Sequence, residues 1–141
     1  MSIELDIEES LVNHLSTELS EIKCEAIGNM DFNDKELIAR AQRKPKGYVI
    51  VQYMGTEAET RSENSTLYKL NATFTLYCFT KSRKGHDGIY ELLDSIRSKT
   101  IAFEYEKHRM IFIRDAMHPF PVSDGLFMSE LQFELIQMRR F

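Results

Sequence analysis

The sequence predicts an α+β domain in which helices pack on one face of a small, mostly antiparallel, four-stranded sheet. Three observations favour this class: an apolar stripe with helical spacing near the start, later runs of alternating apolar and polar residues, and sequence-adjacent strands on either side of one helix. No repeat, low-complexity tract or linker divides the chain. Its 141 residues therefore predict a single domain that spans 1–141.

The first predicted helix begins at Asp6, a suitable N-cap residue. Its apolar positions are spaced three and four residues apart, with acidic residues on the other sides. The stripe consists of Ile7, Leu11, Leu15, Leu19 and Ile22. We expect this helix to end near Cys24, because the Gly and Asn of the segment "AIGNMDFND" favour a connection.

A short second helix is predicted over "KELIARAQRK", which Asp34 opens. The basic residues Arg40, Arg43 and Lys44 suit the C-terminal turn of a helix, and Pro45 with Gly47 closes it. The segment "GYVIVQYM" follows, and its nearly continuous apolar character predicts a central strand.

A polar run from Gly55 to about Leu67 is predicted to form a long loop, since it offers nothing to bury. Strand-like alternation then resumes. The apolar positions of this next strand are Leu70, Ala72, Phe74, Leu76 and Cys78.

The turn "KSRKGHDG" leads to a third predicted helix, which Asp87 can cap. Its core-facing stripe is Ile89, Leu92, Leu93 and Ile96. Two strands complete the prediction: "RMIFIRDA", and after the turn "HPFPVSDG" an alternating strand that includes Phe127, Leu131, Phe133 and Leu135.

The net charge of −4 is unevenly distributed. Residues 1–39 hold ten acidic and two basic residues, hence −8, and the remainder holds twelve and sixteen, hence +4. The asymmetry has two interpretations: a solvated acidic helix face, or unlike surfaces that meet head to tail in a ring. A negative total argues against non-specific nucleic-acid binding as the main task.

The chain start has neither the basic nor the apolar region of a signal peptide, and no apolar run is long enough for a membrane helix. The two cysteines, Cys24 and Cys78, lack metal-ligand spacing, and Cys78 is expected to be a buried free thiol. We therefore expect a protein made in a reducing cytoplasm, without membrane contact, metal or cofactor.

A search for catalytic residues finds no nucleophile elbow, phosphate loop or dinucleotide fingerprint. The histidines His14, His86, His108 and His118 lack the spacing of a zinc pair. His86 precedes Asp87, which could orient an imidazole, but the same residues suit the turn before a helix. The sequence therefore predicts no enzyme.

The segment "CFTKSRKGHDGIYELLDSIRSKT" resembles minor tail proteins of Mu-like phages and prophages. It is also similar to the broader tail-terminator (U-type) family of long-tailed phages and related contractile injection systems. The opening amphipathic helix, the "GYVIVQYMG" strand before a polar run and the final alternating strand agree with that pattern. The resemblance covers roughly residues 7–137 in the order and spacing of elements, and the turn "HPFPVSDG" has no match in it.

The resemblance implies a structural protein without an active site. Six copies would form a ring that binds the end of the tail tube, stops its polymerisation and prepares head–tail joining. The expected partners are further copies of the chain, the tail tube protein and a neck or head-completion protein, with DNA only passing through the lumen. The expected location is the virion tail, and the bacterial host cytoplasm during assembly.

The polar run and the basic turn are the predicted contacts with a neighbouring subunit or the tail tube. Charges alternate along the run, and the turn could face the acidic first helix of a neighbour. The candidate residues are Thr56, Glu57, Glu59, Arg61, Glu63, Lys81, Arg83 and Lys84. Each segment also has a simpler interpretation: a hairpin tip without a role, or a turn that only adds solubility.

Two alternative functions remain open at this point. The first is another structural component of the same particle, namely a neck or head–tail connector protein. The second is a small ligand-binding domain or enzyme centred on His86 and Asp87.

Overall fold

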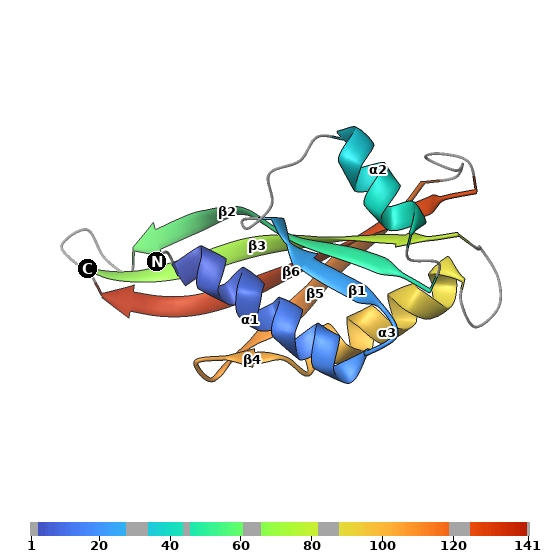
Figure 1. Ribbon diagram of the computed structural model, residues 1–141. Coiled ribbons are helices and arrows are strands. Elements are labelled where there is room, and N and C mark those ends of the chain that lie inside the picture. The colour runs from blue at the N-terminus through green and yellow to red at the C-terminus, as the bar shows by residue number, and fades with distance from the viewer. Residues whose placement is uncertain are drawn as a thin grey trace.

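The computed structural model describes residues 3–27, 34–43, 46–60, 66–81, 88–118 and 125–140 (Figure 1). Within these residues the chain forms three helices and six strands. They are α1 (Ile3–Glu18), β1 (Lys23–Ala26), α2 (Asp34–Gln42), β2 (Tyr48–Thr60), β3 (Leu67–Thr80), α3 (Ile89–Ile101), β4 (Glu104–Tyr105), β5 (His108–Met117) and β6 (Phe127–Arg140).

The strands form one curled, mixed sheet in the order β1-β2-β3-β6-β5-β4. β1 pairs with β2 in parallel and the other neighbours are antiparallel. The predicted four-stranded sheet is therefore wrong. The two missed strands, β1 and β4, lie at the ends of the sheet and are four and two residues long.

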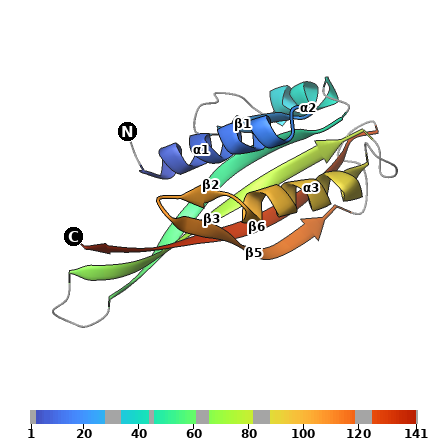
Figure 2. The ribbon, with the colours of Figure 1, turned by 90° about the horizontal axis from the view of Figure 1, so that it is seen from below.

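The helices lie on both faces of the sheet, so the prediction of helices on one face is also wrong. α1 and α3 lie side by side and cover one face, where Leu11 and Ile96 are buried against Phe74 (Figure 2). α2 lies on the opposite face, where Leu37 and Ala41 pack with residues of β2, β3 and the start of β6. The second face is thus covered only near one end.

The alternation predicted along the strands is confirmed by burial. Leu76 and Cys78 of β3 and Leu131 and Phe133 of β6 are fully buried beneath α1 and α3. The predicted stripe of the third helix is buried with them. Removing a side chain of this size from water contributes about 1.5–3 kcal/mol, so these central strands anchor the domain.

The boundaries of the first helix differ from the prediction. α1 already starts by Ile3, so Asp6 lies in its first turn and does not cap it. There the Asp6 carboxylate accepts a hydrogen bond of 2.6 Å from the hydroxyl of Tyr105. The helix ends at Glu18, and Cys24 belongs to β1, where pairing with β2 replaces helical hydrogen bonding. For the third helix the N-cap is Gly88, and Asp87 lies outside the described residues.

Candidate interaction surface

A three-stranded extension of the sheet projects beyond the N-terminal end of α1 (Figures 1 and 2). It consists of residues 55–60 of β2, 67–73 of β3 and 134–140 of β6, and we call it the distal ribbon. Within it Glu59 lies opposite Lys69, which in turn lies opposite Met138. Hydrogen bonding between strands therefore holds residues 55–60 as strand, so the predicted loop is wrong over these residues, while residues 61–65 lie outside the described part.

The distal ribbon begins at a β-bulge in β2. Tyr53 pairs with Phe74 and Gly55 with Thr73, so Met54 is an extra residue with no direct partner on β3. Gly55 has a φ of +139°, a conformation that side-chain-bearing residues rarely adopt. The extra residue shifts the alternation by one position, and as a result Thr56 and Ala58 turn toward the face that carries α1.

The two faces of the distal ribbon differ in chemistry. On the face that carries α1, Ala58 and Leu70 line a groove of about 340 Å³ beside Ile3 and Ile7. The opposite face, which we call the outer face, presents Glu57 and Glu59 of β2, Lys69 of β3, and Ile136 and Met138 of β6.

The outer face continues onto the body of the sheet that α2 leaves uncovered. Ile111 and Met138 lie on this surface and are 49% and 41% exposed, and the bulge residues Met54 and Ile113 are 50% and 43% exposed. Exposed apolar groups that gather on one sheet face are typical of contact surfaces. Two of them, Met54 and Ile113, sit at bulges, where the register changes and strict alternation gave no signal.

The predicted site residues fall into three groups. Thr56, Glu57 and Glu59 are exposed on β2, with Thr56 on the opposite face from the two glutamates. Lys81 is exposed beyond the far end of β3, so the structure does not bring it to the distal ribbon. Arg61, Glu63, Arg83 and Lys84 lie outside the described residues.

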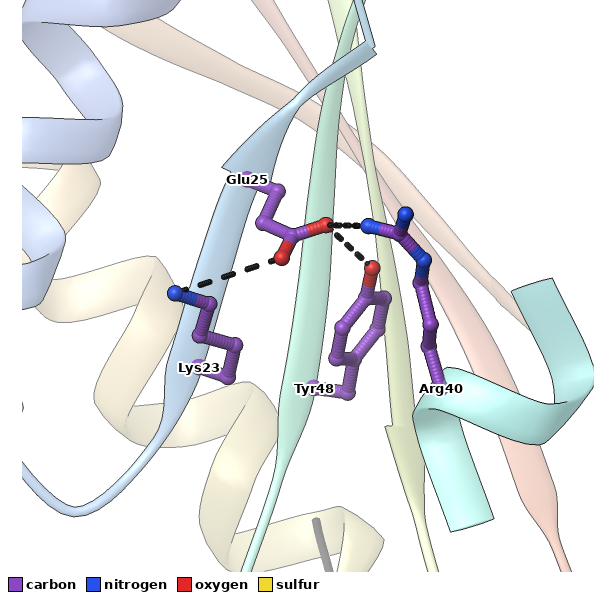
Figure 3. A network of polar contacts seen from close by, with 4 residues as sticks. All are labelled: Lys23, Glu25, Arg40 and Tyr48. Carbon is purple, nitrogen blue, oxygen red and sulfur yellow. Dashed lines mark hydrogen bonds and ion pairs between the residues drawn. The ribbon is translucent and has the colours of Figure 1, made fainter. Parts of the chain in front are cut away.

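A separate polar network joins α2 to the sheet (Figure 3). The Glu25 carboxylate accepts hydrogen bonds from the Tyr48 hydroxyl at 2.6 Å and from the Arg40 guanidinium at 3.0 Å. Lys23 adds a longer ion pair of 4.0 Å. Burial, followed by the bond to Glu25, raises the pKa of Tyr48 well above its usual range. The network brings β1, β2 and α2 together, and this anchoring role could not be predicted from the sequence, because its residues are far apart in the chain.

Other groups that could support chemistry also have structural partners. His14 forms a 2.8 Å hydrogen bond to the backbone oxygen of Lys99 and its ring lies 5.4 Å from that of Phe103. In the part of the chain that the structure describes, no group of three or more His, Cys, Asp or Glu residues could hold a metal ion. His86 and Asp87, the catalytic alternative, lie outside that part.

Comparison with known proteins adds no family assignment. No family model matches the sequence, and a search of curated proteins finds no significant match. None of the helices described is long and apolar enough to cross a membrane.

Proposed function

We propose that this chain is a structural ring subunit of the tail-terminator type. In this role it caps the tail tube of a long-tailed phage or a related injection system, stops tube polymerisation and prepares head–tail joining. The observation that supports it best is the distal ribbon, a sheet extension that projects past the helices. No described strand pairs with residues 55–60 of β2 on one side or with residues 136–140 of β6 on the other.

The distal ribbon is difficult to explain within a monomer. Residues 56–60 are all exposed, so this part of β2 buries no apolar side chain, yet it continues as regular strand. Open strand edges favour unwanted pairing, and natural proteins usually cover or interrupt them. Assembly into a closed ring covers such edges and gives the extension a function.

The chemistry of the described residues also supports a structural role. The carboxylates of Glu8 and Glu25 bond to groups of the fold itself. A surface hollow of about 330 Å³ between the end of α1 and the start of α3, lined by Glu18, Ile22 and Glu91, is open to solvent. Ring subunits need matching surfaces and no catalytic residues, and the resemblance to tail terminators points the same way.

The test is binding to purified tail tubes of the same particle, with tube ends counted by negative-stain electron microscopy and the mass of the free protein measured by light scattering. We expect binding at one end of each tube and a concentration-dependent rise in mass toward about six copies. A variant that lacks residues 57–65 should fold but fail in both assays. Binding to portal complexes and not to tubes would favour the neck or connector protein, and binding to neither would overturn the proposal.

A further inference from the structure

The two lateral edges of the distal ribbon carry opposite charges. Residues 52–60 of β2 include Glu57 and Glu59 and no basic residue. Residues 136–140 of β6 include Arg139 and Arg140 and no acidic residue. Because β3 lies between these strands, the acidic edge and the basic edge face away from each other on the two sides of one sheet.

Neither edge is continued by another described strand. β1 pairs only with residues 48–51 of β2, and β5 pairs with β6 only as far as Leu135. The backbone N–H of Tyr53 is taken by Glu8, just before the distal ribbon starts. Each edge is therefore an extended strand without a described neighbouring strand, which is the geometry for adding a strand from a partner.

We infer that a second copy of this chain docks at these edges, with β2 of one copy pairing in parallel with β6 of the next. β2 and β6 are both antiparallel to β3, so they run in the same direction. A neighbouring copy in the same orientation thus brings its β2 beside β6 in parallel. The inference rests on the proposed function, because it names the contact through which the proposed ring closes.

The charges favour this head-to-tail contact over a twofold contact. Two copies joined β2 to β2 would bring glutamates together, and a β6 to β6 contact would bring arginines together. Like charges on adjacent strands destabilise pairing. The heterologous contact joins an acidic edge to a basic edge. It leaves one acidic and one basic edge at the two ends of the growing assembly, so further copies add until the ring closes.

The side-chain levels fit the contact on the outer face. Glu57 and Ile136 pair with the same residue of β3, and Glu59 and Met138 both pair with Lys69. The two residues of each pair therefore lie at the same height along the strands. Arg140 lies two residues further along β6 on the same face, as a diagonal neighbour of Glu59 from the next copy. Diagonal positions on adjacent strands are within reach of long side chains.

The first test reverses one charge on each edge. Glu59→Arg and Arg140→Glu should each weaken self-association by at least about tenfold, because like charges then meet at every contact. An equimolar mixture should recover assembly, since alternating copies restore an unlike pair at each contact. Glu104→Arg, an exposed reversal on β4, is the matched control and should assemble as the unmodified protein does.

The second test uses cysteines and a short bis-maleimide. A chain with both Glu59→Cys and Met138→Cys should give a ladder of cross-linked species, whereas either single variant should stay monomeric on a denaturing gel. Cys24 and Cys78 are 5% and 0% exposed, so they should not compete for the reagent. Efficient dimers from either single variant would show a twofold contact and overturn the inference.

The two proposals can fail separately. A protein that binds tube ends, yet assembles equally well with either reversed charge, or stays monomeric at all concentrations, overturns the edge pairing and leaves the proposed function standing. A protein that passes the mixing and cross-linking tests but binds no tube supports the edge pairing and overturns the proposed function.

Discussion

The carboxylate of Glu8 in α1 accepts a hydrogen bond of 2.7 Å from the backbone N–H of Tyr53 in β2. Glu8 is only 4% exposed although it is an acidic residue on a helix. The bond lies next to the bulged residue Met54, where β2 passes from the body of the sheet into the distal ribbon. The first helix thus supports the strand at the position where the side-chain alternation changes.

Replacing Glu8 should therefore destabilise the fold. Glu8→Ala leaves a covered N–H without its acceptor, at a cost of about 1–3 kcal/mol. Glu8→Gln keeps a carbonyl oxygen and should lose less. Chemical denaturation measures both, with the exposed Ser16→Ala on the same helix as control. Equal stability of Glu8→Ala and the unmodified protein would contradict the role assigned to this bond.

The turn between β4 and β5 should be open to stabilisation. Glu106 and Lys107 both have positive φ, at 47° and 70°, a conformation that Asn and Gly adopt far more readily. The double variant Glu106→Asn and Lys107→Gly should raise the free energy of unfolding by about 1 kcal/mol. Lys107→Ala keeps the unfavourable backbone and should give no gain. A loss of stability in the Asn-Gly variant would show that the original side chains hold the turn.

The two thiols should be unreactive in the folded protein and should not form a disulfide. Val49 of β2 stands between Cys24 of β1 and Cys78 of β3, which places the cysteines two strands apart, too far for a disulfide. Burial, followed by the charge of Glu25, raises the pKa of Cys24 to about 12. Burial also raises the pKa of Cys78. Reaction with a coloured disulfide reagent at pH 8 should therefore follow unfolding. Fast labelling under native conditions would contradict this burial.

Stability should fall at alkaline pH in part through Tyr105. Burial, followed by the hydrogen bond to Asp6, raises the pKa of this phenol from 10 to about 12. A raised pKa means that folding favours the neutral phenol. The contribution of Tyr105 to the free energy of unfolding is therefore complete below pH 10 and is lost as the pH rises toward 12. Tyr105→Phe should be about 1 kcal/mol less stable at pH 7 and should decline less steeply above pH 10. If the free energy of unfolding of the two proteins fell in parallel above pH 10, Tyr105 would make no such contribution.

The helices could be predicted because burial imposes its period on the sequence. The stripes of α1 and α3 place residues such as Leu11 and Ile96 beneath the same face. For α2 the end signals predicted a helix, but they could not say that Leu37 packs on the face of the sheet opposite to α1 and α3. β1 was missed because four residues are too few to show a period, and its stability comes from pairing with β2.

The candidate site shows the same limit. Glu57 and Glu59 alternate with small residues, which is the two-residue period of a strand, but none of these side chains is buried. Hydrogen bonding to β3 fixes their conformation, and this partnership cannot be read from β2 alone. The sequence could therefore indicate which residues are candidates but not that they line the edge of a sheet.

The position of β6 has a consequence for biosynthesis. β6 is the last strand in sequence, yet it lies between β3 and β5 and pairs with β3 along its whole length. Until residues 127–140 have left the ribosome, the first three strands and the β4–β5 hairpin cannot join into one sheet. The nascent chain thus holds two incomplete parts of the sheet, and the sheet can be completed only after β6 has been translated.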